Sequence, residues 1–250
     1  FGLKDTGTSA KESQRLPSSG VLDEKLVVGR DGDKGEIIEL LSRKYEHAGA
    51  VNFGVVAIVG LPGVGKTTLA QLVFNNKDDA MKEFELKVWV SVSDDFDVVR
   101  VTKAILQSIT SQPVQVEEFS KMQHDLSEQL RGKKFLIVLD DIWDKDDYDL
   151  YDLWTRLQSP FGVGAGGSNI IVTTRDRNVA KITGAAGVHN LECMADDDCM
   201  EIFERHEFGE INNGKPVNYE VIRTKIVGKC CGLPLAARTV GGLLRRQEKE

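Results

Sequence analysis

The sequence has few cysteines, no long apolar run and no excess of positive charge, and each absence excludes a class of protein. Four cysteines in 250 residues are too few for a disulfide scaffold, which fits a reducing compartment. No apolar run approaches the roughly 20 residues that a membrane span needs, and the first residues contain no signal-peptide core. The 32 Lys and Arg against 39 Asp and Glu give a net charge of −7, so no surface for nucleic acid or an anionic membrane is expected. A cytoplasmic protein is predicted.

The composition is otherwise that of an ordinary globular protein, with 41% hydrophobic and 28% charged residues. Residues 1–26 are predicted to be a linker, because TGTSAKESQRLPSSG is rich in Ser, Thr and Gly and has no apolar periodicity. The chain beyond the linker is long enough to bury a substantial core.

Short apolar runs alternate with helical patterns from about residue 27 onward. The runs are nearly continuous, as expected for parallel strands covered on both faces. They are Val55–Val59, Leu86–Val92, Phe135–Leu139, Asn169–Thr174 and a weaker one at Val188–Leu191. Helices are expected at Thr67–Phe74, over Phe119 to Leu130 and over Leu150 to Leu157. The pattern predicts an α/β fold, a parallel five-stranded sheet flanked by helices.

After about Leu191 the pattern is helical only. Cys199, Ile202, Phe203 and His206 share one helical face, and further helices are expected at Tyr219–Lys229 and Leu235–Arg246. We therefore predict an α/β domain over residues 27–190 and a small all-helical domain over residues 191–250.

The strongest local signal is GLPGVGKTT, residues Gly60–Thr68, which follows an apolar run and opens a helix. It matches the phosphate-loop pattern GxxxxGK[ST] in the required strand–loop–helix context. Backbone N–H groups of such a loop surround phosphate oxygens, and the helix N-terminus adds partial positive charge. Lys66 is expected at the β- and γ-phosphates, Thr67 on Mg²⁺ and Thr68 at the α-phosphate. The loop residues expected against the phosphates are Pro62, Gly63, Val64 and Gly65.

Two acids follow the third apolar run, in FLIVLDDIW. Ligands bind at the carboxyl ends of strands in open parallel sheets, so Asp140 suits Mg²⁺, through water, and Asp141 could orient or deprotonate an attacking water. The alternative is that both are solvated loop acids.

An arginine follows the fourth apolar run, in GSNIIVTTR. At this position Arg175 could sense a γ-phosphate through a charge-assisted hydrogen bond, although a surface arginine after a strand is common.

With these elements in order, the chain resembles the NB-ARC module of plant disease-resistance proteins of the nucleotide-binding, leucine-rich-repeat type, in the subgroup with an N-terminal coiled coil. The resemblance covers roughly residues 27–246. Beside the phosphate loop, LDDIW and TTR, it uses the motifs VVGRD (Val27–Asp31), FELKVWVSVSDDFD (Phe84–Asp97), DDCMEIFERHEFG (Asp197–Gly209) and CCGLPLAARTVGGLL.

The resemblance implies site residues that the phosphate loop alone does not. Val28, Gly29 and Arg30 would line the adenine side, and Pro234, with Leu233 beside it in GLPLA, would lie against the base and ribose. It also assigns Asp140 and Asp141 to metal and water, and Arg175 to the γ-phosphate.

The resemblance implies a switch, in which a resting ADP form exchanges to ATP after pathogen sensing and the receptor then self-associates. ADP or ATP with Mg²⁺ is the expected cofactor, and the coiled coil, winged helix and leucine-rich repeats of the full receptor are the expected partners. The sequence ends before a winged helix or repeats, and only a coiled-coil remnant is expected in residues 1–26. A dedicated ATPase is the alternative; for the switch, at most slow hydrolysis is expected.

Overall fold

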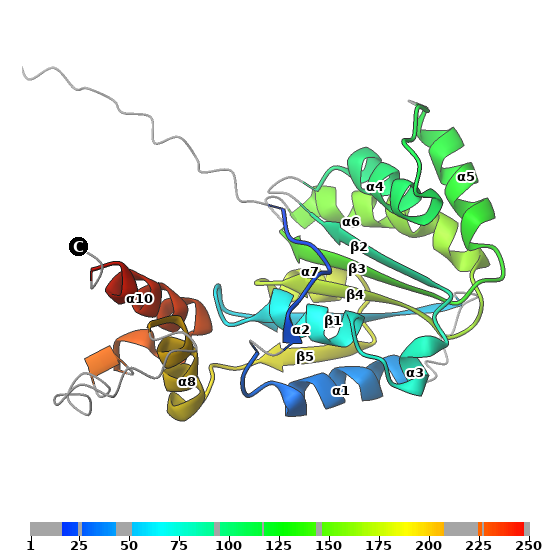
Figure 1. The fold of residues 1–250 in the computed structure, drawn as a ribbon. Coiled ribbons are helices and arrows are strands. Elements are labelled where there is room, and N and C mark those ends of the chain that lie inside the picture. The colour runs from blue at the N-terminus through cyan, green and yellow to red at the C-terminus, as the bar shows by residue number, and fades with distance from the viewer. Residues whose placement is uncertain are drawn as a thin grey trace, which may run out of the picture.

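The computed structural model describes residues 17–24, 27–43, 52–92, 96–116, 118–143, 147–207, 225–226 and 228–247. Figure 1 shows a sheet between two layers of helices, with further helices beyond one end of its strands. The strands are β1 (Phe53–Gly60), β2 (Leu86–Ser91), β3 (Phe135–Ile142), β4 (Ser168–Thr174) and β5 (Gly187–Leu191). The helices are α1 (Asp31–Ser42), α2 (Lys66–Phe74), α3 (Asp79–Lys82), α4 (Val98–Thr110), α5 (Phe119–Leu130), α6 (Asp147–Gln158), the 3-10 helix η2 (Ser159–Val163), α7 (Arg177–Ile182), α8 (Asp196–Glu207) and α10 (Pro234–Gln247).

The five strands form one sheet in the order β2-β3-β4-β1-β5, and every neighbouring pair is parallel. The register between β3 and β4 is irregular between Leu139 and Ile142, next to the acids that end β3. The predicted α/β class with a parallel five-stranded sheet is confirmed.

Burial differs between central and edge strands. Almost every residue of β1, β3 and β4 is buried, as the continuous apolar runs predict. The same expectation is wrong for β2 and β5, where buried residues alternate with more exposed ones. These two strands lie at the edges of the sheet, where neighbouring strands and helices cover them on fewer sides.

Alternating side chains of the strands form two cores on opposite faces of the sheet. On one face Phe135, Ile137 and Leu139 of β3 pack with α4, α5 and α6. On the other, Leu136 and Val138 pack with α1, α2 and α3. The sheet is therefore covered on both faces, which leaves the strand ends as the open part of the structure.

Helices α1, α3, α4 and α7 were not predicted, although α4 and α1 each have a recognisable sequence signal. α4 follows Asp97, whose side chain accepts hydrogen bonds from the N–H groups of Val99 and Arg100 and so caps the helix. α1 places Ile37 and Leu41 four residues apart, and both are buried against the sheet.

After β5 the described residues form helices that pack on each other. Met194, Cys199, Phe203 and Ala237 form a separate core with α8 and α10, and Val28 from the N-terminal side joins it. The predicted helical region is therefore present where it is described. Residues 1–16 and 25–26 of the predicted linker and most of the predicted helix Tyr219–Lys229 lie outside the described residues.

Within the described ranges, none of the helices is both long and apolar enough to cross a membrane.

Candidate functional site

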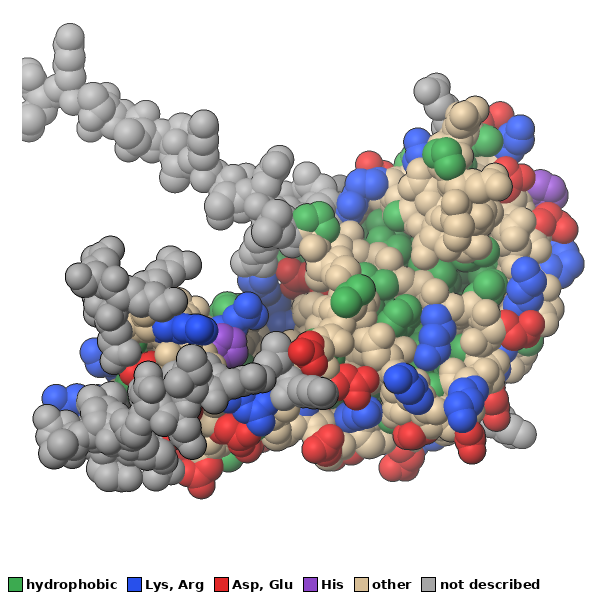
Figure 2. Space-filling model, viewed as in Figure 1, with side chains coloured by type: hydrophobic (Ala, Val, Ile, Leu, Met, Phe, Trp, Pro, Cys, Tyr) green, Lys and Arg blue, Asp and Glu red, His purple; other side chains and the backbone are tan. Residues whose placement is uncertain are grey.

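A cavity of about 950 Å³ lies at the carboxyl ends of the strands, between the sheet and the helical region. Figure 2 shows the surface indented between these two parts, with Lys and Arg side chains gathered at the junction. Its lining combines sheet and helical residues with the segment before α1: Pro17, Ser18, Leu22, Asp23, Val27, Val28, Arg30, Pro62, Gly63, Gly65, Lys66, Thr67, Thr68, Ser91, Val92, Arg100, Asp140, Asp141, Arg175, Met194, Ile202, His206, Pro234, Leu235 and Arg238.

The phosphate loop joins the end of β1 to the start of α2. Gly63 and Gly65 have φ angles of 76° and 104°, in the left-handed region that favours glycine. A β-carbon at Gly63 would also lie 3.0 Å from the Leu235 Cβ, so the loop approaches α10 closely. The backbone thus turns tightly enough to present N–H groups at the α2 N-terminus, the geometry that binds phosphate oxygens.

Lys66 begins α2 and is only 6% exposed. Its ammonium donates to the carbonyls of Gly60 at 2.9 Å and Leu61 at 3.0 Å, within its own loop. These bonds hold a compact positive charge at the mouth of the loop, where phosphate oxygens would compete for it.

Asp140, near the end of β3, is 2% exposed yet reaches the cavity. The Thr67 hydroxyl lies 3.0 Å from both of its carboxylate oxygens, and the Thr173 hydroxyl donates to Oδ1 at 2.6 Å. Strands β3 and β4 and helix α2 therefore bring the predicted metal ligands Asp140 and Thr67 together.

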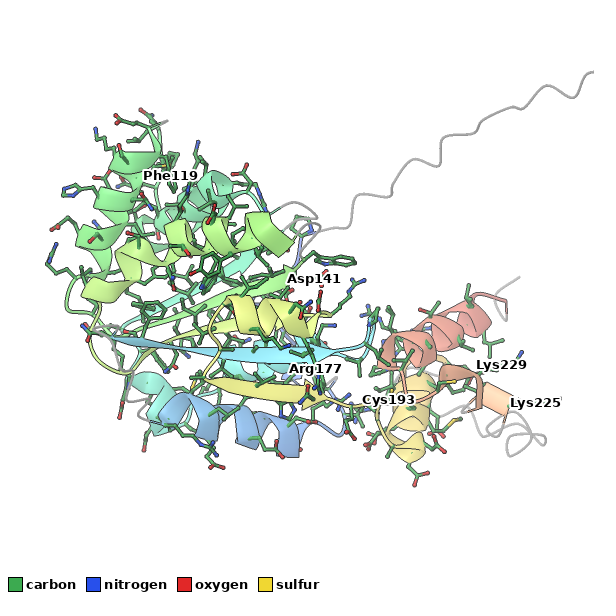
Figure 3. The ribbon with its side chains drawn as sticks, turned by 180° about the vertical axis from the view of Figure 1, so that it is seen from behind. Phe119, Asp141, Arg177, Cys193, Lys225 and Lys229 are labelled. Carbon is green, nitrogen blue, oxygen red and sulfur yellow. The ribbon has the colours of Figure 1, made fainter. Side chains whose placement is uncertain are left out.

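Asp141 has a φ of 62°, and its N–H donates to the Thr173 hydroxyl at 2.8 Å. Asp141 lines the same cavity as Asp140, and Figure 3 shows it at the strand end that faces the helical region. Its carboxylate lies 3.4 Å from the Arg175 guanidinium, which also stacks 4.0 Å from the Trp143 ring centroid. Asp141 and Arg175, which were predicted separately for the attacking water and the γ-phosphate, thus lie side by side.

Arg30 ties three parts of the site together and is 7% exposed. Its Nη2 donates to the carbonyl of Val64 in the phosphate loop at 2.8 Å and to that of Glu192, just after β5, at 3.0 Å. Its Nη1 pairs with Asp33 at 3.1 Å, and Asp33 in turn lies 2.8 Å from the His189 ring. Arg30 therefore fixes the loop against the connection to the helical region.

Helix α10 begins directly over the phosphate loop. The Leu235 N–H donates to the Gly63 carbonyl at 3.2 Å, and Pro234 and Leu235 both line the cavity. Gly29, beside Arg30, has a φ of 66°, which favours glycine, and a β-carbon there would lie 2.4 Å from the Asp198 carboxylate of α8, which would have to move. The VVGRD and GLPLA segments thus meet the phosphate loop from two sides.

The structure brings most of the predicted site residues to one cavity. Val28, Arg30, Pro62, Gly63, Gly65, Lys66, Thr67, Thr68, Asp140, Asp141, Arg175 and Pro234 line it. Gly29, Val64 and Leu233 lie beside the cavity rather than on its wall: Val64 is fully buried, and Leu233 packs against the core under α2.

Several lining residues were not predicted, among them Ser18, Arg100, His206 and Arg238. Arg100 and Arg238 add positive charge to that of Lys66, Arg30 and Arg175. Ser18 and Arg100 lie outside every motif named above, whereas His206 and Arg238 lie in DDCMEIFERHEFG and CCGLPLAARTVGGLL. Neither motif indicates by itself that these two side chains reach the cavity, so the fold was needed to place all four.

These residues fit a nucleotide with a divalent cation. A hydroxyl and a carboxylate, the oxygen donors that Mg²⁺ prefers, lie in contact beside a glycine cradle that a side chain would fill. In the part of the chain that the structure describes, His, Cys, Asp and Glu form no cluster of three or more that could hold a metal ion by themselves.

Comparison with known proteins agrees with these motifs. The family model described as the NB-ARC domain matches residues 30–211. The disease resistance RPP13-like protein 1 of Arabidopsis thaliana is 42% identical over 253 residues, which cover 100% of this chain and 23% of that protein. Disease resistance protein RGA2 of Solanum bulbocastanum is 38% identical over 242 residues, 96% of this chain and 24% of that protein. The chain thus spans about a quarter of the length of these relatives.

Solved structures show the same fold in more distant proteins. The ORC1 protein of Aeropyrum pernix, solved in complex with DNA, matches with a TM-score of 0.61 at 17% identity over 91% of this chain and 64% of that one. Drosophila ORC bound to DNA matches with a TM-score of 0.56 at 14% identity over 96% of this chain and 64% of that one. At such identities the likeness concerns the fold alone.

Proposed function

Because the chain belongs to the NB-ARC domain family, the nucleotide-binding module of plant disease resistance proteins, we propose that it is an adenine-nucleotide switch that holds ADP or ATP with Mg²⁺. The receptor to which it belongs would act inside the cell in defence against pathogens. The observation that carries the proposal is the shared cavity, with a phosphate loop on its sheet side and the first turn of α10 directly over that loop.

The roles proposed at the phosphate end follow from the contacts there. Lys66 and the loop N–H groups would bind the β- and γ-phosphates, and Thr68 the α-phosphate. Thr67 and Asp140 would hold Mg²⁺, which neutralises phosphate charge when it is bound.

Arg175 and Asp141 would report which nucleotide is present. A γ-phosphate would compete with Asp141 for the guanidinium, because both are anions within reach of one arginine. ADP leaves the Arg175–Asp141 pair intact, so the two nucleotides would stabilise different arrangements at the strand ends.

The base end would belong to the segments that link sheet and helices. Val28 and Arg30 on one side and Pro234 on the other would enclose the base and ribose. We propose the nucleotide-binding domain as residues 27–190 and the helical domain as residues 191–250, with the hinge after β5, where Arg30 holds the Glu192 carbonyl.

The alternative is an ATPase whose output is turnover. Asp141 lines the cavity, so it could orient an attacking water, but its carboxylate lies beside Arg175, and this pairing favours the switch.

The test is the nucleotide that copurifies with the protein, identified by mass spectrometry, together with single-turnover and steady-state ATPase rates. Bound ADP with negligible turnover is expected. Rapid multiple turnover would instead support the ATPase, and a protein that neither retains nor binds adenine nucleotide would remove both functions.

The remaining proposals concern the whole receptor. We propose that this module contacts the coiled coil, winged helix and leucine-rich repeats of the full protein and that the activated receptor self-associates. Nucleic acid and membrane are not proposed as partners, because the net charge of −7 opposes binding to polyanionic surfaces. A cytoplasmic location also stays a prediction.

A further inference from the structure

The residues before α1 lie across the nucleotide site. We name residues 17–24 the N-terminal strap; in Figure 1 the dark blue trace passes in front of α2. Asn75 donates to the Gly20 carbonyl at 2.6 Å, and Gln71 donates to the Ser19 carbonyl at 2.5 Å. The strap is therefore attached to the end of α2 through its backbone.

The strap also fits closely against an aromatic pair. A β-carbon at Gly20 would lie 2.9 Å from a ring carbon of Phe74 and 3.5 Å from the Trp89 Cβ. Phe74 and Trp89 pack edge to face with their ring centroids 5.6 Å apart, so the ring cannot easily make room. Even a small side chain at position 20 would push the strap away from the domain.

One strap residue reaches the predicted metal ligand. The Ser18 hydroxyl donates to Oδ2 of Asp140 at 2.6 Å and accepts from the Trp89 indole N–H at 3.3 Å. The Ser18 N–H donates to the Ser91 hydroxyl at 3.2 Å, which fixes the backbone at the same point.

When the strap is docked, hydroxyl groups take up most of the hydrogen-bonding positions of the Asp140 carboxylate. A carboxylate has about four lone-pair positions. Thr67 lies 3.0 Å from both oxygens, Thr173 lies 2.6 Å from Oδ1, and Ser18 occupies the pocket side of Oδ2. A metal ion, or a water bound to it, needs one of these positions.

Of the three hydroxyls, that of Ser18 is the one that can leave. Thr173 is fully buried in the central strand β4, and Thr67 would itself be a metal ligand. Ser18 is held by a strap whose residues are mostly exposed, Val21 for example by 83%. Few buried apolar contacts oppose its release.

We propose that the N-terminal strap and Mg²⁺ compete for Asp140. A docked strap lowers the affinity of the site for Mg²⁺, and binding of Mg²⁺ with ATP displaces Ser18 and loosens the strap. This inference rests on the proposed function. It couples metal binding at Asp140 to the position of the strap.

The test is a Mg²⁺ titration of ATP binding to the 250-residue chain, with a fluorescent ATP analogue, for wild type and Ser18→Ala. The Mg²⁺ concentration for half-maximal binding is expected to fall about tenfold in Ser18→Ala, because a hydrogen bond to a charged group is removed. Ser19→Ala is the matched control: its side chain is exposed and its bonded carbonyl is retained, so its titration should match wild type.

Hydrogen exchange of residues 17–24 is the second measurement. In wild type, Mg²⁺ with ATP is expected to speed exchange of the strap amides. Gly20→Val, which displaces the strap while keeping the Ser18 hydroxyl, should show fast exchange throughout and the same gain in Mg²⁺ affinity.

The outcomes separate the two claims. A wild-type chain that binds no nucleotide with or without Mg²⁺ would refute the proposed function. If wild type binds ATP but both variants keep its Mg²⁺ dependence, or if Ser18→Ala binds Mg²⁺ more weakly, competition is wrong while the switch proposal stands.

Discussion

The two walls of the cavity are built differently. The phosphate wall stands on β1, β3 and β4, whose residues are almost all buried between two layers of helices. The opposite wall, from α8 and α10, has a small core of its own, and among the described residues of this core none comes from a strand of the sheet. A rigid wall suits recognition of phosphate, while a separately packed wall can move without disturbing the sheet.

The largest effect is expected from breaking the smaller core. Phe203→Ala removes a fully buried ring from the core of α8 and α10. The free energy of unfolding of this helical region should fall by about 3–5 kcal/mol. Hydrogen exchange should then rise in α8 and α10 while β1, β3 and β4 stay protected. Leu126→Ala, in the core on one face of the sheet, is the matched comparison and should expose the sheet instead. If Phe203→Ala unfolds both regions in one step, the two walls are not independent.

Next in size is a change confined to the phosphate wall. Lys66→Arg replaces a compact ammonium with a planar guanidinium at a residue that is only 6% exposed. Because the larger group cannot take the same position, the affinity for nucleotide should fall by about 100-fold or more. Calorimetric titration with ADP and ATP measures this. Lys77→Arg, at an exposed lysine shortly after α2, should bind as wild type does. Unchanged affinity in Lys66→Arg would remove the phosphate-loop assignment.

The smallest effect is expected at Arg30, which connects the phosphate loop to the segment after β5. Arg30→Lys keeps the charge but cannot reproduce bonds to Val64, Glu192 and Asp33 together, so stability should fall by about 1–2 kcal/mol. Exchange of residues 192–195 should rise more than that of β1. Arg43→Lys, at an exposed arginine after α1, serves as the control. Equal exchange at the connection in both variants would show that Arg30 does not hold it.

More of the phosphate wall than of the opposite wall could be predicted from the sequence. GLPGVGKTT and FLIVLDD carry local signals, because a strand, a loop and a helix start follow each other within a few residues. Continuous apolar runs also identify the central strands of the sheet. In β2 and β5 buried and more exposed residues alternate, because both strands lie at the edges, and the order of strands in a sheet cannot be predicted from the apolar runs.

The residues that were missed depend on long-range contacts. Ser18 lies 122 positions from Asp140 in the chain, and nothing near it in the sequence indicates a partner. Arg100 and Arg238 likewise reach the cavity only because α4 and α10 are placed beside it. Asp97, in contrast, is a local capping signal that could have revealed α4.

The connection between β5 and α8 is short, and its length limits what a moving wall can do. Five peptide units separate Leu191 from Asp196, a reach of roughly 17 Å when fully extended. The start of α8 is therefore tethered to the edge of the sheet, so the helical region can pivot about this point but cannot drift away from it. A tether of this kind would keep α8, and with it α10, which shares its core, close to the phosphate loop, so a helical region that turned outward would return to the same nucleotide rather than to another molecule's.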